Sequence, residues 1–271
     1  MKYVIRSCRT RDELAGCVKL QRTIWGYAKD EVYPLRLFVN LQKIGGMVVG
    51  AFAPGGELVG FVTGMPAWHG KRRYIHSLSL GVAAGHENRG LGQRLKLEQR
   101  RRVLDAGIDC IEWTFDPMRA KNAFLNLVRL GAIARRYTPD YYGPVKSRLQ
   151  QGLPSDRLIC EWWLKSPGVK RAVQGKPARD LSAKPVAEVE IPAEMKSWAE
   201  DHPRQAQAAQ SKVRARLMGL FRKGLVITGF SIDGATGRYL LDRAVDLNLP
   251  VSVGAAQAKR PVSAKFSKRM P

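Results

Sequence analysis

Long apolar runs are missing from this 271-residue sequence. No stretch of about eighteen apolar residues occurs, so we expect no membrane-spanning helix. The first residues, MKYVIRSCRTRDEL, lack the apolar centre of a signal peptide, which favours a cytoplasmic protein. Cysteine is scarce: Cys8, Cys17, Cys110 and Cys160 are never spaced as C-x-x-C. Their scatter argues against a metal or disulfide framework and predicts reduced, buried thiols.

Acidic residues are also few. The chain has 46 Lys and Arg against 23 Asp and Glu, a formal net charge of +23, and both halves are basic. Such a charge attracts nucleic acid, acidic membranes or phosphate-rich cofactors without choosing among them. No zinc-ligand spacing, RNP string or GxxG clamp accompanies it, so nucleic-acid binding has only the charge in its support.

A strand–loop–helix junction at residues 74–106 is the most informative part of the sequence. Residues 74–82 (YIHSLSLGV) contain β-branched and alternating residues, which predicts a strand. A polar loop at 83–88 follows, and residues 89–106 have helical periodicity. The pattern predicts leucines on the inner side of this helix and basic side chains, Lys96 included, on its outer side.

Two glycines, Gly90 and Gly92, fall in the first turn of the predicted helix. Backbone amides there have no partner inside the helix, and the missing side chains let an anion approach them. The helix dipole favours the same anion, and Arg89 and Arg94 add positive charge. The residues thus indicate either a phosphate or diphosphate site, or a glycine-softened helix start with a basic flank.

The strand and the string from Glu87 to Gly92 resemble the acyl-CoA-binding signature of the GNAT acetyltransferase superfamily. That signature is a strand followed by Gln/Arg-x-x-Gly-x-Gly/Ala at a helix start. Leu80 and Val82 stand on the strand, and Glu87 replaces the usual Gln or Arg. The resemblance covers roughly residues 1–165. The strings WTFDP, GAIARRY and SDRLICEWWL are also similar to a little-described branch of predicted acetyltransferases.

The resemblance implies an acyl-CoA co-substrate, with acetyl-CoA expected, and no metal. The backbone at Leu80 and Val82 would pair with the pantetheine arm, with a bulge at Gly81, and an amide near Leu80 would polarise the thioester. Asn122 would reach the same arm. The implied cofactor-binding residues are Leu80, Gly81, Val82, Glu87, Asn88, Arg89, Gly90, Leu91, Gly92, Gln93, Arg94 and Asn122.

Transfer to an amine requires a general base. Glu112 is the first candidate, because an apolar strand surrounds it and burial would raise its pKa. An ion pair with an arginine is the competing interpretation. His76 is the second candidate, with a structural histidine as its alternative. Many members of the family carry a general-acid Tyr where Leu127 stands here. Tyr141 or Tyr142 would have to substitute for it, and we take Tyr142 as the candidate.

The predicted element order for residues 1–165 is β-α-α-β-β-β-α-β-α-β-β, an α/β (α+β) GNAT fold with a mixed central sheet. Residues 166–185 are rich in Pro, Gly, Ala and Lys and predict a linker. Residues 186–245 predict a smaller α+β subdomain that is similar to the opening of a GNAT domain. Residues 246–271 predict a basic, disordered tail.

Three functions stay open at this point. The first is an acyl-CoA-dependent N-acyltransferase in which an amine of a small molecule or peptide attacks the thioester directly. The second is a non-catalytic acyl-CoA-binding or sensor module, favoured by Glu87 and the missing tyrosine. The third is a basic nucleic-acid-binding protein. The acceptor, the acyl chain length and the oligomeric state, a dimer included, stay open as well.

Overall fold

A mixed β-sheet organises the residues that the computed structural model describes, which are 2–143, 152–180, 182–195 and 200–247. Its strands are β1 (Val4–Ser7), β2 (Met47–Phe52), β3 (Leu58–His69), β4 (Arg72–Val82), β5 (Cys110–Phe115), β6 (Ile133–Thr138), β7 (Arg157–Trp163), β8 (Ala187–Pro192), β9 (Leu225–Asp233) and β10 (Thr236–Arg243). The helices are α1 (Arg11–Trp25), α2 (Leu35–Lys43), α3 (Leu91–Asp105), α4 (Ala120–Ala123), α5 (Pro167–Val173) and α7 (Pro203–Arg222). A π-helix, η1 (Phe124–Arg129), continues α4, and a short 3-10 turn, η2 (Ala244–Leu247), follows β10.

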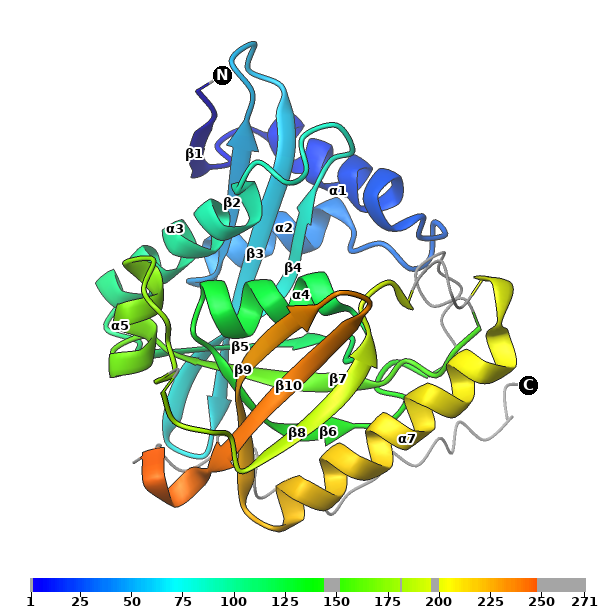
Figure 1. Ribbon diagram of the computed structural model, residues 1–271. Helices are drawn as coiled ribbons and strands as arrows, with labels where there is room; N and C mark the ends of the chain where they lie inside the picture. Colours follow the sequence, from blue (N-terminus) through cyan, green and yellow to red (C-terminus); the bar gives the residue numbers. More distant parts are fainter. Residues whose placement is uncertain (1, 144–151, 181, 196–199, 248–271) are drawn as a thin grey trace, which may run out of the picture.

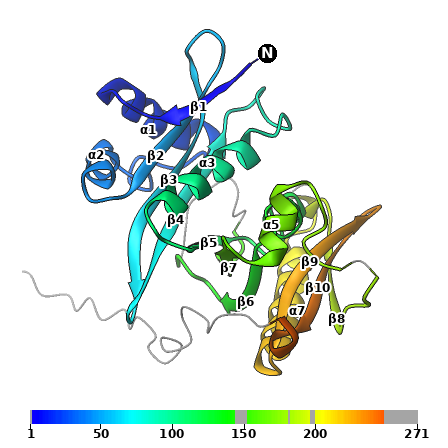
Figure 2. The same cartoon turned by 90° about the vertical axis from the view of Figure 1, so that its left-hand side faces the viewer.

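The strand order across the sheet is β1-β2-β3-β4-β5-β7-β6-β9-β10-β8. The pair β4 and β5 is parallel, and the other neighbouring strands in the described residues are antiparallel. α1 and α2 cover one face of the first four strands and α3 covers the other (Figures 1 and 2). The predicted order β-α-α-β-β-β-α-β-α-β-β is confirmed.

Local sequence signals explain several of these elements. α1 begins at a capping box, in which the Glu13 amide donates to Thr10 Oγ1 (3.2 Å) and the Thr10 amide donates to the Glu13 carboxylate (3.4 Å). α1 ends at Gly26, whose φ of +66° is the left-handed conformation that glycine tolerates best. All four cysteines are buried, as expected. In the described part of the chain, no helix is long and apolar enough to span a membrane.

The parallel strands β4 and β5 are paired at only two positions, Ile75 with Ile111 and His76 with Glu112. Beyond this last pair the strands part. The β3–β4 register also shifts here, so that Ser77 and Leu78 of β4 stand opposite one residue of β3. This is the bulge of the strand.

The predicted bulge at Gly81 is wrong, because Gly81 pairs regularly with Phe61. Glycine is needed at this position for a different reason. A Cβ atom at Gly81 would lie 2.9 Å from Ile24 and 3.0 Å from Trp25, where the end of α1 packs closely against β4.

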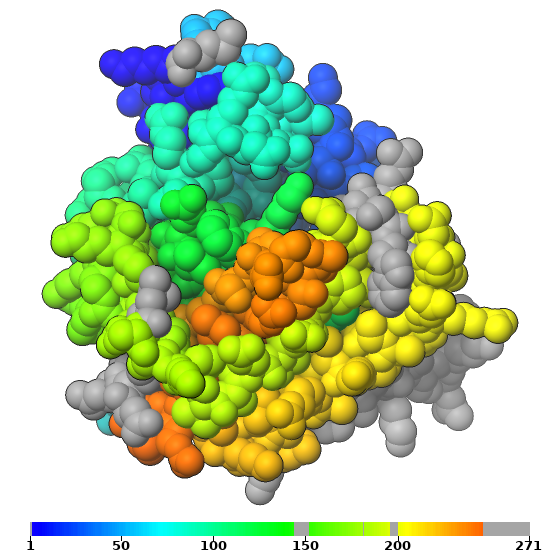
Figure 3. Space-filling view, viewed as in Figure 1, coloured from blue at the N-terminus to red at the C-terminus, as the bar shows by residue number. Residues whose placement is uncertain are grey.

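The C-terminal strands continue the same sheet past β6, through the single pair Ala134 and Ile227. α7 packs on β6, β8 and β9. The hairpin β9–β10 lies against the segment around α4 (Figure 3), and the buried Tyr239 hydroxyl donates to the Pro117 carbonyl oxygen at 2.6 Å. α7 also holds the start of β7, because Arg214 forms a 2.7 Å ion pair with the buried Asp156.

The C-terminal half differs from expectation in three respects. Helix α5 occupies part of the predicted linker 166–185, because Ser166 caps it and Pro167 suits its first turn. The predicted helix after β5 is π-helical over its second half. β8 pairs with β10, whereas β1 pairs with β2, so the strand order of a GNAT opening is not repeated. The predicted tail falls mostly outside the described residues.

Candidate active site

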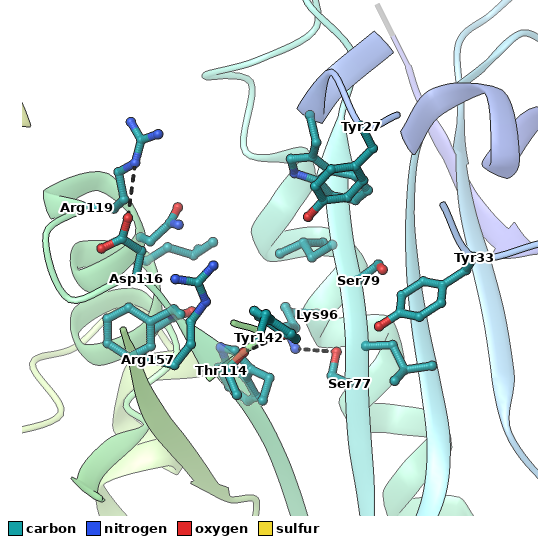
Figure 4. Close-up of a pocket in the computed structure, with 18 of the residues that line it drawn as sticks. Tyr27, Tyr33, Ser77, Ser79, Lys96, Thr114, Asp116, Arg119, Tyr142 and Arg157 are labelled. Atoms are coloured by element: carbon teal, nitrogen blue, oxygen red, sulfur yellow. Dashed lines mark hydrogen bonds and ion pairs between the residues drawn. The ribbon is translucent and has the colours of Figure 1, made fainter. Parts of the chain in front are cut away.

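A cleft of about 450 Å³ opens between β4 and β5 where these strands part. β4 contributes residues 77–80, and β5 with the position after it contributes 113–116. The loop between α1 and α2 supplies Glu31 and two tyrosines, and the β6–β7 loop supplies Tyr142 (Figure 4). The missing strand pairing therefore produces a channel that ends at the pair His76 and Glu112.

The start of α3 adjoins this cleft. Gly90 is the N-cap with φ +72°, and the Arg94 amide makes the first helical hydrogen bond to the Gly90 carbonyl (3.0 Å). The amides of residues 91–93 therefore precede the helical ladder. A Cβ at Gly92 would lie 3.7 Å from Leu125 and 4.0 Å from Leu80, which both line the cleft.

The arginines at this helix start bind the N-terminal segment. Arg89 donates to the Tyr3 hydroxyl at 3.2 Å, and Arg94 donates to the Tyr3 carbonyl at 2.8 Å. The turn itself is exposed at Glu87, Asn88, Arg89 and Gly90. An anion can therefore approach the amides with the two guanidinium groups beside it.

The predicted cofactor-binding residues do not all reach the cleft. Leu80 and Asn122 line it. Gly81 and Leu91 are buried, and Val82 packs against an apolar cluster beneath the sheet. Gln93 lies beside η1, where its amide group is 3.5 Å from the Arg129 carbonyl. The remaining predicted residues, from Glu87 to Arg94, form the exposed helix start described above.

Glu112 and His76 face each other in register, but neither lines the cleft. Glu112 is buried and forms an ion pair with Arg136. Burial raises the pKa of Glu112 to about 7, against the opposing effect of Arg136. Burial and the charges of Lys96 and Arg136 lower the pKa of His76. The catalytic assignment of both residues stays a prediction.

Tyr142 does line the cleft, and its hydroxyl lies 3.1 Å from Thr114 Oγ1. The Arg157 guanidinium lies 5.1 Å from the centre of the Tyr142 ring. Leu127, at the position of the family's tyrosine, is fully buried and is not part of the cleft wall. Tyr142 is thus placed at the cleft, and its function as a general acid stays a prediction.

Lys96 is the cleft residue that the sequence pattern assigned to the wrong side of α3. Lys96 is 1% exposed, and it lines the cleft from the buried side of α3. Nζ donates to Ser77 Oγ (2.9 Å) and to Gln99 Oε1 (3.1 Å), and it lies 3.7 Å from the centre of the Trp113 ring. Burial lowers the pKa of Lys96 to about 7. A signal was present, because Lys96 and Gln99 share a helical face with Val103 at i, i+3 and i+7.

Two parallel strands that part beside a helix start rich in glycine are the arrangement that the resemblance to acetyltransferases implied. Residues 8–126 match the acetyltransferase (GNAT) family. This part of the chain is therefore a GNAT acetyltransferase domain, and the predicted fold class is confirmed. No curated protein matches the chain.

Several solved structures are similar to this chain. NAA60 of Arabidopsis thaliana in complex with acetyl-CoA has a TM-score of 0.50 and 17% identity, over 60% of this chain and 98% of its own. The ribosomal-protein-S18-alanine N-acetyltransferase of Escherichia coli has a TM-score of 0.46 and 14% identity, over 59% and 92%. A GNAT acetyltransferase of Streptococcus pneumoniae has a TM-score of 0.48 and 16% identity, over 59% and 98%. At 17% identity the comparison with NAA60 concerns the fold alone, and the other two similarities, with TM-scores below 0.5, carry no argument.

Proposed function

We propose that this chain is an acyl-CoA-dependent N-acyltransferase that moves an acetyl group from acetyl-CoA to an amine by direct attack on the thioester. The observation that carries the proposal is the cleft between β4 and β5, which begins beside the start of α3 and ends at the last strand pair. One end offers helix-start amides to a diphosphate, and the other would hold the reacting group.

The cleft fits an extended pantetheine arm. Beyond His76, no described residue of β5 pairs with β4, so the β4 backbone from Ser77 to Leu80 faces the cleft instead of a neighbouring strand. The arm's amides would pair with that backbone as an added strand does. Asn122 lies in the opposite wall and would bind the same arm. The amides of residues 91–93 and the flanking arginines would bind the diphosphate.

The bulge at Ser77 and Leu78 suits the reacting end. Because a bulge leaves one residue outside the strand ladder, an amide at this point would be available to polarise the thioester carbonyl. The sequence assigned this amide to the region of Leu80, and the observed bulge moves the proposal two or three residues toward the last strand pair.

The acceptor amine would enter from the side of the α1–α2 loop. Tyr27, Glu31 and Tyr33 of this loop line the cleft. Acids and bases both contribute to the lining, for example Glu31 and Asp116 against Lys96 and the cleft arginines. A small-molecule amine and a peptide amino group therefore both remain within the proposal.

We keep Glu112 as the proposed general base, because it belongs to the last strand pair next to the cleft and burial raises its pKa to about 7, which suits proton transfer near neutral pH. Glu112→Gln should remove the ascending limb of the kcat/KM profile near that pH and lower the rate about 100-fold or more. If Glu112 only forms a structural ion pair with Arg136, the variant would lose stability while its pH profile kept its shape.

The direct test has two stages. Isothermal titration with CoA and acetyl-CoA should show one binding site. Thiol release from acetyl-CoA should then accelerate with at least one member of a panel of small amines and peptides. The matched variant pair is Gly92→Val, which places a side chain against Leu80 and Leu125, and Gly107→Ala, at the far end of α3. The first should weaken binding of CoA and the second should not.

Other results would lead elsewhere. Binding of CoA without thiol release by any amine would favour the non-catalytic binding module. RNA binding that falls steeply with salt, with no heat from CoA, would favour the nucleic-acid-binding protein.

A further inference from the structure

The Lys96 ammonium lines the cleft next to the last pair of β4 and β5. His76 and Glu112 are the last paired residues of β4 and β5, so Ser77 and Trp113 are the first unpaired ones. Lys96 Nζ touches both. It lies 2.9 Å from Ser77 Oγ (Figure 4), and it lies 3.7 Å from the centre of the Trp113 ring. An arm that enters beside the start of α3 and follows β4 therefore ends next to this ammonium.

We propose that Lys96 is the proton donor to the CoA thiolate that leaves during acyl transfer. This inference rests on the proposed function above. As the acceptor nitrogen bonds to the acyl carbon, the C–S bond breaks and sulfur takes its electron pair. One Nζ–H proton then passes to sulfur, which gives the free thiol of CoA and a neutral lysine. The nitrogen of the new amide loses its own proton to the general base, and Lys96 regains a proton from water.

The partners of Nζ suit a donor that must release its proton. Both hydrogen-bond acceptors, Ser77 Oγ and Gln99 Oε1, are neutral oxygens. Among the described residues, no carboxylate makes a hydrogen bond or ion pair with Nζ. A carboxylate would hold the proton, whereas neutral oxygens position the ammonium without retaining its charge. The Trp113 face adds a cation–π contact that keeps the charged form available before the reaction.

The acidity of Lys96 supports this assignment. Its pKa of about 7 lies below the value of about 8.5 for an ordinary thiol, so transfer to a thiolate is downhill. The ionisable groups that interact with it are few. The Cys160 thiol on β7 opposes the lowering, and His76 on β4 has its own pKa lowered by the lysine charge.

The other donors in the cleft are less suited to the step. Guanidinium groups such as that of Arg157 do not give up protons in proteins. Burial raises the pKa of Tyr33 to about 12. Tyr142 is the competing donor, and its hydroxyl is engaged with Thr114.

The test compares two acyl donors that differ in their leaving group. CoA needs a proton as it leaves, whereas 4-nitrothiophenol departs readily as the thiolate. Lys96→Met should lower kcat with acetyl-CoA about 100-fold or more, and should change the rate with S-(4-nitrophenyl) thioacetate little. Each comparison uses one protein sample, so partial misfolding lowers both rates alike and cancels in their ratio.

Two companion variants separate charge from proton donation. Lys96→Arg keeps the charge but cannot donate, so it should fail with acetyl-CoA as Lys96→Met does. Tyr142→Phe should slow both donors to the same extent. Full activity of Lys96→Arg with acetyl-CoA would overturn the proposal. The proposal would also be overturned if Tyr142→Phe lowered the rate with acetyl-CoA but not with S-(4-nitrophenyl) thioacetate.

The proposal and the proposed function can fail separately. If the wild type turns over acetyl-CoA and Lys96→Met loses nothing, or loses the same factor with both donors, only the assignment of Lys96 falls. If the wild type releases no thiol with any amine, both fall. A third readout is independent of activity: lysine labelled with ¹³C at Cε should show one resonance titrating near pH 7, absent from Lys96→Met.

Discussion

The buried charge of Lys96 makes a quantitative prediction about stability. Burial lowers its pKa from the ordinary 10.5 to about 7. Between these two values the unfolded chain binds nearly one proton more than the folded chain at this side chain. The pKa of Lys96 is lower in the folded chain than in the unfolded chain. The free energy of unfolding is therefore highest above the ordinary pKa of 10.5, and it decreases as the pH falls toward 7. Loss of the side chain in Lys96→Met should abolish this dependence.

The magnitude follows from the size of the shift. The free energy of unfolding of the wild type, relative to that of Lys96→Met, should rise by about 1.4 kcal/mol per pH unit over this range. The whole range amounts to on the order of 5 kcal/mol. Lys96 is fully buried, so solvent does not screen the effect as it does for a surface charge.

The measurement is urea-induced unfolding, followed by tryptophan fluorescence, at several values between about pH 7 and about pH 9.5. Lys212→Met is the control, since it removes an exposed lysine of α7 and should leave the slope unchanged. A stability difference between the wild type and Lys96→Met that stays constant with pH would refute the reasoning. The ammonium would then have to be solvated or paired in the folded protein.

Three further predictions concern the frame around the cleft. Gly90→Ala and Gly107→Ala both place a side chain at φ +72° and should each lower the free energy of unfolding by about 1–2 kcal/mol. Only Gly90→Ala should lower the affinity for CoA in calorimetry, and equal affinities of the two variants would contradict the diphosphate site. Arg214→Met leaves the buried carboxylate of Asp156 without its cation and should lower the free energy of unfolding by about 3–5 kcal/mol, whereas an unchanged urea midpoint would show the pair to be unimportant. Tyr239→Phe leaves the buried carbonyl oxygen of the β5–α4 loop without its hydrogen-bond donor and should lower the free energy of unfolding by about 1–3 kcal/mol in the same assay. An unchanged value would mean that water replaces the hydroxyl.

Local patterns explain what could be predicted from the sequence. The capping box at Thr10, the left-handed glycine after α1 and the glycine pair at the start of α3 act through neighbours within four residues. The alternation of residues 74–82 and the order of elements likewise reflect short-range periodicity. These signals were sufficient for the order of elements and for the position of the helix start that adjoins the cleft, whereas the GNAT fold was implied by the resemblance to that family.

The polar partners inside the fold required the tertiary structure. Glu112 meets Arg136 only because β7 brings β6 near β5, and Arg89 meets Tyr3 across 86 positions of sequence. The C-terminal strands join the main sheet through a pairing that no local pattern encodes. Long-range partners of this kind depend on strand order, which periodicity within one segment does not specify.

Lys96 shows most clearly which properties follow from the sequence and which follow from the tertiary structure. The sequence alone determined that it lies on a helix that begins at a glycine-rich turn, one position after an inward-facing leucine. Only the tertiary structure decided that β4 bulges and parts from β5 opposite this residue, so that its ammonium is enclosed by Ser77, Gln99 and Trp113. A helix pattern records which face is apolar, but the cost of burying a charge depends on which oxygens and rings the rest of the chain brings to meet it.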